Sequence, residues 1–213
     1  ITGALNVPTG VGLEGSWQAP HTGATDKGTT LLITGGRGHE DGTPTITLQT
    51  DAALRGVTMV WPDQKADNIT PYPWAIAGLH DHNTVENVTF INAYQGIVIG
   101  PNGQGGGLHL IRNVFGCVLR RGVYVAFCAD IGRIENVHFN PDYWLRSGYS
   151  PILENYSDKS LFDYTESHLE GFVFGRSDWE YVQGAFVYGA EYGYRFIHTP
   201  DGGCNGELVN IGA

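Results

Sequence analysis

The sequence predicts an all-β fold, a parallel β-helix, and three observations lead to that prediction. Apolar residues come in short runs bounded by Gly, Asn, Asp or Pro, which is typical of short strands separated by turns. Strong helix formers seldom cluster, because Gly, Thr, Asn and β-branched residues recur in most windows. The chain of 213 residues also repeats itself at intervals that are typical of solenoids.

The repeat begins with a charged residue followed by Asn or Gly and continues as an apolar strand. Its members are Arg55-Gly-Val-Thr-Met59, Glu86-Asn-Val-Thr-Phe90, Arg112-Asn-Val-Phe-Gly116, Glu135-Asn-Val-His-Phe139 and Glu170-Gly-Phe-Val-Phe174. A second strand begins at Gly96 and at Gly122, nine residues after the repeat asparagine in each case (96 − 87 and 122 − 113). Two strands per repeat favour a parallel β-helix over helical solenoids and over propellers, whose blades have about four strands.

Stacked repeats would place equivalent side chains in columns. The first column alternates in charge over four members, so neighbours about 4.8 Å apart would attract one another. It consists of Arg55, Glu86, Arg112, Glu135 and Glu170. The second column is an amide ladder of Asn87, Asn113 and Asn136. Exposed ion pairs contribute only about 0–1 kcal/mol each, so we expect the charges to fix the register and the buried Val and Phe columns to supply stability.

Residues 1–213 are expected to form one β-helix domain with one interruption. Residues 141–167 are rich in aromatic side chains and lack the repeat, which predicts an insertion with one short helix near 157–164. Such insertions are often functional, and a binding groove is expected beside this one. No capping segment is recognised at either end, so we interpret the sequence as a piece of a longer β-helix whose open ends would pair with another copy.

Charge and composition disfavour several classes of partner. Twelve Lys plus Arg against 22 Asp plus Glu give a formal net charge of −10, which disfavours nucleic acid and anionic membranes. No apolar stretch reaches the ~20 residues of a membrane-spanning helix. The cysteines, Cys117, Cys128 and Cys204, are too few for a disulfide scaffold and are interpreted as buried free thiols. No cofactor is predicted, because the Gly-rich segment 103–107 lacks the Lys and Ser or Thr of a phosphate-binding loop.

Carboxylates and one histidine are the candidate catalytic residues. Polysaccharide hydrolysis uses two carboxyl groups on either side of the scissile bond, one of them protonated. Asp130 precedes a repeat strand, and Asp178 and Glu180 lie two residues apart, where an extended chain would place both on one face and Trp179 on the other. His138 alternates with Val137 and Phe139, so it is expected to face outward near Tyr143 and Trp144 and is the candidate histidine of the groove. The alternative is that these carboxylates belong to ordinary solvated turns.

Four aromatic residues are the candidates for substrate binding: Tyr143, Trp144, Trp179 and Trp74. They fall near predicted strand ends, and an aromatic ring can cover the apolar face of a sugar while its polar atom stays hydrated. The alternative is that they fill the corners of the coil.

No metal site is predicted. His80-Asp81-His82 would place two imidazoles on one side of an extended segment, but nothing nearby in the sequence completes a ligand set, so we predict a polar turn. Lyase chemistry would need a base together with charge neutralisation of a uronate, commonly by Ca²⁺, and no acidic cluster of that type stands out.

Four segments resemble the pectate-lyase-like β-helix superfamily and, more narrowly, bacterial proteins related to glycoside hydrolase family 28. They are Leu54-Arg-Gly-Val-Thr-Met-Val-Trp-Pro-Asp-Gln64, Pro71-Tyr-Pro-Trp-Ala-Ile76, Asp130-Ile-Gly-Arg-Ile-Glu-Asn-Val-His-Phe-Asn-Pro141 and Asp178-Trp-Glu-Tyr181. The resemblance covers nearly the whole chain and implies a right-handed, single-stranded parallel β-helix, secretion to an extracellular or periplasmic location, and action on or binding to a polysaccharide. The chain departs from family 28 because it lacks the Asn-Thr-Asp, Asp-Asp, Gly-His-Gly and Arg-Ile-Lys signatures.

Two hypotheses follow. The first is an extracellular carbohydrate-active β-helix that binds or cleaves a polysaccharide, with hydrolysis favoured over elimination if the protein is an enzyme. The second is a non-catalytic glycan-binding, adhesive or structural fragment that associates end to end. A groove with two carboxyl groups at catalytic separation would favour the first, whereas carboxylates that are scattered or bonded into turns would favour the second.

Overall fold

The computed structural model describes residues 1–20, 27–150 and 158–213, and these form mostly parallel β-structure, with 54% strand and 9% helix. One sheet takes in all the named strands, and each pairing between them is parallel. The all-β, parallel prediction is therefore confirmed. The strands are β1 (Leu5–Val7), β2 (Gly12–Glu14), β3 (Thr29–Leu32), β4 (Ile46–Leu48), β5 (Ala53–Val60), β6 (Trp74–Gly78), β7 (Thr84–Ile99), β8 (Leu110–Phe139), β9 (Glu170–Gln183), β10 (Phe186–Val187), β11 (Tyr192–Phe196) and β12 (Cys204–Val209).

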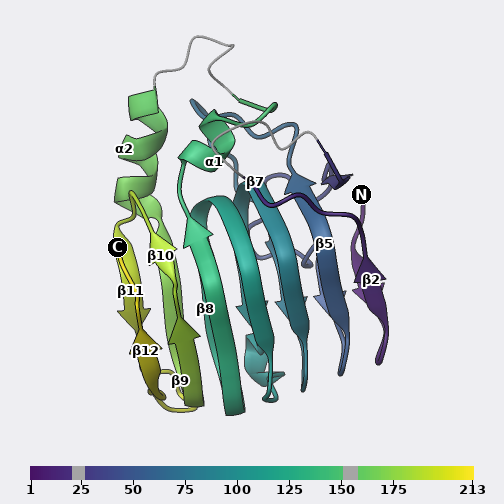
Figure 1. Ribbon diagram of the computed structural model, residues 1–213, viewed down its shortest axis with the longest axis vertical. Coiled ribbons are helices and arrows are strands. Elements are labelled where there is room, and N and C mark those ends of the chain that lie inside the picture. The colour runs from purple at the N-terminus through teal and green to yellow at the C-terminus, as the bar shows by residue number, and fades with distance from the viewer. Residues whose placement is uncertain (21–26, 151–157) are drawn as a thin grey trace.

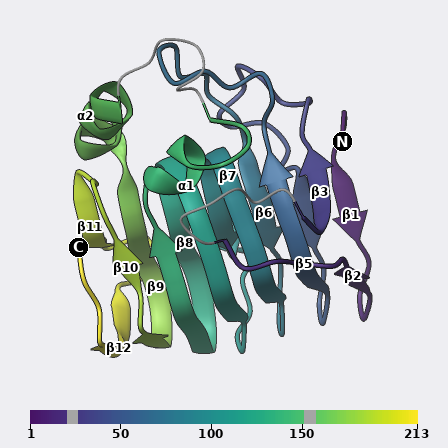
Figure 2. The same ribbon diagram turned by 45° about the horizontal axis from the view of Figure 1, so that its top comes forward.

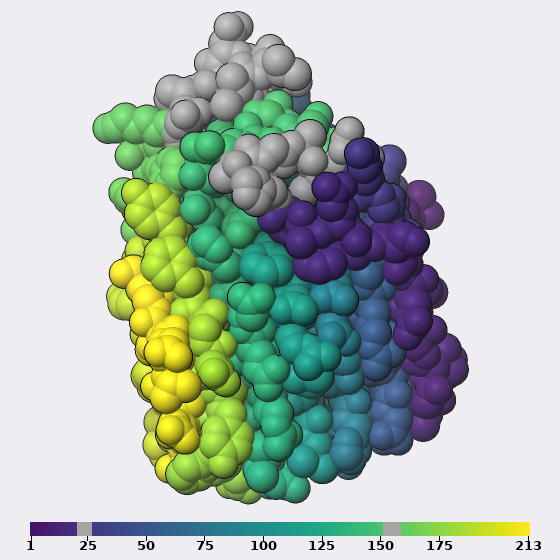
Figure 3. Space-filling model, in the orientation of Figure 1, coloured from purple at the N-terminus to yellow at the C-terminus, as the bar shows by residue number. Residues whose placement is uncertain are grey.

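Strands from successive repeats lie side by side in chain order (Figure 1). β5 pairs with β7, β7 with β8, and β8 with β9. The N-terminal strands lie along one edge of the molecule and the C-terminal strands along the opposite edge (Figure 3). β7 and β8 are 16 and 30 residues long, and β7 pairs with β5 through one stretch and with β6 through another.

The predicted columns follow from this register. Arg55 pairs with Glu86, which pairs with Arg112, and the Glu86 carboxylate lies 3.5 Å from Arg55 Nε and accepts a hydrogen bond of 2.9 Å from Arg112 Nε. The amide ladder is also present, because Asn113 donates to Asn87 and Asn136 donates to Asn113, each at 2.9 Å. All three asparagines have left-handed backbones with φ of 52–57°, a conformation that Asn tolerates better than most residues.

The fifth member of the repeat differs from the prediction. Glu170 pairs with Arg121, whereas Glu135 pairs with Gln183. The residue after Gln183 is Gly184, whose φ of 64° matches the left-handed asparagines of the ladder. The assignment to Glu170 was wrong because both strands of each repeat are apolar, so a Phe-Val-Phe pattern alone does not distinguish them.

Inward-facing side chains of neighbouring strands form continuous buried columns. One is aliphatic throughout and is at most 1% exposed: Leu54, Val85, Ile111, Ile134 and Val182. Burying one such side chain completely contributes roughly 1.5–3 kcal/mol, more than an exposed ion pair does. The columns therefore stabilise the sheet, as expected from the sequence.

In the described parts of the chain, three short helical segments accompany the sheet: η1 (Pro101–Gly103), α1 (Asp142–Leu145) and α2 (Asp158–His168). The helix predicted near 157–164 is thus found as α2, and α1 and α2 lie at the same end of the sheet (Figure 2). Residues 151–157 of the predicted insertion lie outside the described residues. Among the described residues, no helix is long and apolar enough to span a membrane.

Candidate functional site

One side of the sheet carries an aromatic pair, Trp74 on β6 and Tyr124 on β8. Both side chains are half-buried, and their ring centroids lie 6.3 Å apart at an interplanar angle of 31°. Trp74 comes from the start of β6, where its register partner is Gln95, and Tyr124 follows the buried Val123 in β8. Because side chains alternate along a strand, Val123 faces the core and Tyr124 faces the other side.

Two hollows flank the aromatic pair. The first has a volume of about 300 Å³, and its wall contains Trp74 together with polar and acidic side chains: Glu40, Asp41, Thr47, Asn102 and Gln104. The second has a volume of about 290 Å³ and is lined by Tyr124 together with Arg121, Glu170, Val173, Arg195 and Ile197. An amphipathic ring in contact with each hollow, surrounded by hydrogen-bonding groups, suits a ligand with apolar faces and polar edges.

The carboxylate of the second hollow is held by three arginines. Glu170 is 2% exposed, it accepts hydrogen bonds from Arg121 Nε at 2.8 Å and from Arg195, and it lies 3.3 Å from Arg120. Burial opposes ionisation of this carboxyl, but the hydrogen bonds and positive charges of the arginines outweigh it and lower its pKa. Glu170 is therefore a fixed anion, with little freedom to exchange a proton near neutral pH.

The three carboxylates predicted from the sequence differ in their exposure to solvent. Asp130 is exposed and accepts a hydrogen bond from the Ile131 amide at 2.8 Å. The Asp178 side chain is 52% exposed and lies 2.9 Å from Arg176, whereas Glu180 is 0% exposed. Among the described residues, no hydrogen bond or ion pair joins Asp130 to Asp178.

The expectation that Asp178 and Glu180 share a face was wrong. The register between β8 and β9 shifts here, because Cys128 pairs with Ser177 while Ile131 pairs with Trp179. This irregularity interrupts the alternation of the strand, so Asp178 and Trp179 are both exposed and the next residue turns inward.

The other predicted site residues fall into separate groups. His138 is half-buried, its Nδ1 lies 3.1 Å from the Tyr143 hydroxyl, and burial lowers its pKa. Trp144 is 2% exposed, and its indole donates to the carbonyl of Tyr149 at 2.9 Å, so its ring belongs to the core. Trp179 is 42% exposed and packs edge-on against Tyr181.

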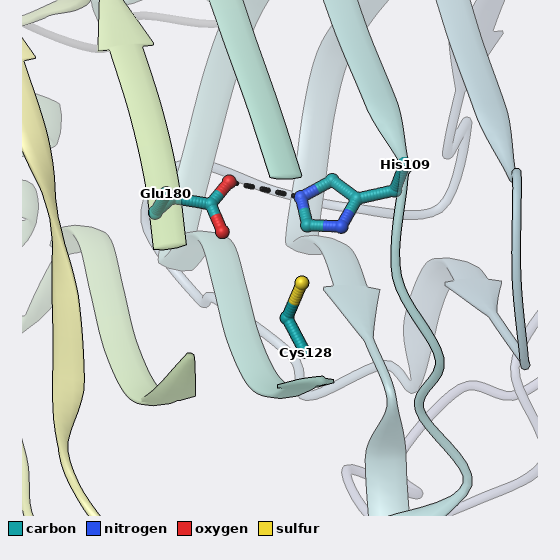
Figure 4. Close-up of side chains that lie close together, drawn as sticks. All are labelled: His109, Cys128 and Glu180. Carbon is teal, nitrogen blue, oxygen red and sulfur yellow. Dashed lines mark hydrogen bonds and ion pairs between the residues drawn. The ribbon is translucent and has the colours of Figure 1, made fainter. Parts of the chain in front are cut away.

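A second cluster, buried in the sheet interior, was not predicted. It consists of His109, Cys128 and Glu180, each at most 1% exposed (Figure 4). His109 Nε2 lies 2.9 Å from Glu180 Oε1, and the other carboxylate oxygen accepts a hydrogen bond from Ser177 Oγ at 3.2 Å. The Cys128 thiol donates to the carbonyl of Asp130 at 2.8 Å. One side-chain donor atom of each of the three residues lies within 4.8 Å of the other two.

Gly132 makes this buried contact sterically feasible. It pairs with Glu180 on one side, and its neighbour Arg133 bonds to the carbonyl of His109 on the other. A Cβ at Gly132 would lie 2.5 Å from Glu180 Oε1 and would also overlap the His109 ring. The two side chains therefore meet in the space that the missing side chain leaves.

The electrostatics of the cluster follow from its burial. Burial by itself would lower the pKa of His109, but the charge of the nearby Glu180 carboxylate and its hydrogen bond to the ring raise it above the usual range. The imidazole Nε2 and the carboxylate are thus held in a buried contact of 2.9 Å. Among the described residues, no hydrogen-bond partner reaches the second ring nitrogen, Nδ1. Because the cluster is shielded from solvent, it suits a structural or ligand-holding role rather than attack on a dissolved substrate.

Comparison of the chain with protein-family models, with curated proteins and with solved structures finds no match. The function is therefore inferred from the side chains and their geometry alone.

Proposed function

We propose that the protein is a right-handed parallel β-helix that binds an extracellular neutral polysaccharide in the two hollows beside Trp74 and Tyr124. The aromatic pair between these hollows is the observation that carries the proposal. The rings supply apolar platforms, and the amide, hydroxyl and carboxylate groups of the walls supply hydrogen bonds.

Repetition along the sheet supports the β-helical arrangement. The position held by the ladder asparagines is left-handed in six successive passes of the chain: Gly56, Asn87, Asn113, Asn136, Gly184 and Asn210. A turn of the same hand at the same point of each pass is what a coil requires if it is to stack on the one before. The parallel strands of successive repeats fit the same arrangement.

Charge favours a neutral ligand over a polyuronate. The chain carries a formal net charge of −10, and the first hollow has two carboxylates, Glu40 and Asp41, in its wall. The arginines of the second hollow are already engaged with Glu170. A polyanion would be repelled by the first hollow and would have to compete with Glu170 for the second.

The positions of the predicted carboxylates favour binding of the polysaccharide without its cleavage. Glycoside hydrolysis needs two carboxyl groups on either side of the bond, roughly 5–10 Å apart. Of the predicted candidates, Asp178 is engaged with Arg176 and Glu180 is buried against His109. Carboxylates bonded in this way match the second hypothesis from the sequence, a glycan-binding module.

The test is calorimetric titration with a panel of soluble neutral and acidic polysaccharides, together with a reducing-end assay on each. We expect binding of at least one neutral polymer without release of reducing ends. Trp74→Ala and Tyr124→Ala should each weaken that binding by roughly tenfold, equivalent to about 1.4 kcal/mol. Trp179→Ala is the matched control, because Trp179 is a surface tryptophan that lies outside both hollows.

Two results would contradict the proposal. One is the absence of binding to any member of the panel. The other is binding that Trp179→Ala abolishes and Trp74→Ala leaves unchanged. Reducing-end release that disappears in Asp178→Asn would instead establish a hydrolase. Light scattering on the same samples tests end-to-end association, the alternative function.

A further inference from the structure

We propose that His109, Cys128 and Glu180 form a buried site for a transition-metal ion, with Zn²⁺ as the expected occupant. The three residues come from different parts of the chain, with His109 just before β8, Cys128 within β8 and Glu180 within β9. Their donor atoms nevertheless lie within 4.8 Å of one another and away from solvent (Figure 4). Nothing in the polysaccharide-binding proposal depends on this site.

The chemistry of the donors selects the class of metal. Imidazole nitrogen, thiolate sulfur and carboxylate oxygen are each donors that Zn²⁺ takes in proteins. Ca²⁺ and Mg²⁺ instead require several oxygen ligands, of which this cluster offers two from Glu180 and one from the Ser177 hydroxyl. The single soft sulfur of Cys128 therefore points to zinc or a neighbouring divalent transition metal.

One pair of donors is already close to the spacing that such an ion needs. Metal–ligand bonds of about 2.0–2.3 Å in a tetrahedral site separate the ligand atoms by roughly 3.5 Å. The distance of 2.9 Å between His109 Nε2 and Glu180 Oε1 would have to widen by about half an ångström to admit the ion. Gly132 keeps this region free of a third side chain, so the His109 and Glu180 side chains alone occupy the space where the ion would lie.

The charges of the donor set also suit a divalent ion. The His109 ring is 1% exposed, so any charge in the cluster lies away from solvent. A divalent ion bound by a neutral imidazole, a thiolate and a carboxylate would leave no net charge in the interior. Ser177, which bonds to the second carboxylate oxygen, would orient Glu180 toward the ion.

Burial assigns this site a structural role. The donors are closed off from solvent, whereas a catalytic zinc site keeps one position open to water or substrate. A bound ion would connect β9 to β8 and to the segment before β8. Because the donors are at most 1% exposed, we expect the ion to be taken up as the chain folds.

The experiment uses the full chain and two metals as probes. The protein is unfolded in guanidinium with a chelator, freed of both, and refolded with Zn²⁺, with Co²⁺ or without metal. Metal content is then measured by mass spectrometry, and Co²⁺ ligation by its near-ultraviolet thiolate charge-transfer absorption. Cys128→Ser and Glu180→Gln test the site. Cys117→Ser is the matched control, since Cys117 is an equally buried thiol outside the cluster.

We expect about one Zn²⁺ per chain in the wild type and in Cys117→Ser, and near zero in Cys128→Ser and Glu180→Gln. The Co²⁺ charge-transfer band should follow the same pattern. A refolded wild type that retains no stoichiometric Zn²⁺ and develops no such band with Co²⁺ would overturn the proposal. So would a folded Cys128→Ser variant, verified by circular dichroism, that binds as much metal as the wild type. The wild-type measurements decide the matter even if Cys128→Ser fails to fold.

Discussion

The imidazole of His109 and the carboxylate of Glu180 meet across a glycine, although 71 positions separate them in the sequence. His109 immediately precedes β8 and Glu180 lies in β9, and Gly132, in a later stretch of β8, lies between them. His109, Gly132 and Glu180 belong to the same column of the sheet, so any side chain at position 132 would separate the other two.

Gly132→Ala should therefore break the His109–Glu180 contact. Gly132 does not have a left-handed backbone, so a loss of stability in this variant would come from crowding and not from backbone strain. Because the displaced groups are charged and buried, we expect the free energy of unfolding to fall by about 3–5 kcal/mol, as for other disrupted buried pairs. Urea denaturation followed by circular dichroism measures it.

The control for this prediction is Gly148→Ala. A Cβ at Gly148 would meet no atom within 4 Å, and this backbone is not left-handed either. Its effect should stay within about 0.5 kcal/mol. Equal effects of the two substitutions would show that crowding at the His109–Glu180 contact does not determine stability.

A double-mutant cycle would isolate the buried pair itself. Glu180→Leu alone leaves the imidazole without its partner, and we expect a loss of about 3–5 kcal/mol. Adding His109→Leu removes the unpartnered group, so the double variant should recover most of that loss. Unfolding is measured with a chelator present, so that only protein groups contribute. Additive effects of the two substitutions would contradict a direct interaction.

The sequence predicted the strand columns because the motif that places them recurs in successive repeats. Asn87, Asn113 and Asn136 share one backbone conformation and one bonding pattern, so the alignment of their repeats was sufficient to place them. Glu170 was misplaced because local apolar alternation does not report which strand of the repeat a segment forms. The pairing of Glu170 with Arg121 depends on the length of the insertion before it, and the repeat pattern does not encode that length.

The same misplacement hid the buried cluster. His109 and Gly132 each lie three residues before the charged residue of their repeat, Arg112 and Glu135 (112 − 109 and 135 − 132). Glu180 lies three residues before Gln183, the residue that actually pairs with Glu135 (183 − 180). With the correct fifth repeat, the alignment would have placed a histidine, a glycine and a glutamate in one column. Cys128 precedes an irregularity in strand pairing, so the repeat alignment could not have placed it beside the other two residues.

The asparagine ladder predicts a specific order of stability at its central member. Asn113→Ala removes two side-chain hydrogen bonds and keeps a left-handed backbone that alanine adopts poorly, so we expect a loss of about 2–3 kcal/mol. Asn113→Gly removes the same bonds but tolerates the positive φ, so its loss should be about 1 kcal/mol smaller. Thermal and urea unfolding of both variants measure the difference. A glycine variant less stable than the alanine variant would contradict the backbone argument.

Glu170 should make part of the stability dependent on acid pH. Its pKa is lowered in the folded state, because the bonds and charges of Arg121, Arg195 and Arg120 outweigh the opposing effect of burial. A carboxyl group with a depressed folded pKa stabilises the fold fully above its unfolded pKa, near 4.5, and loses that contribution as pH falls through the folded value. Glu170→Gln should therefore be less stable than the wild type at pH 7, and the difference should shrink below about pH 4.5.

Glu166→Gln, exposed on α2, is the control and should show little difference at either pH. A deficit of Glu170→Gln that stays constant from pH 7 to pH 3 would mean that the arginines do not stabilise the ionised carboxylate.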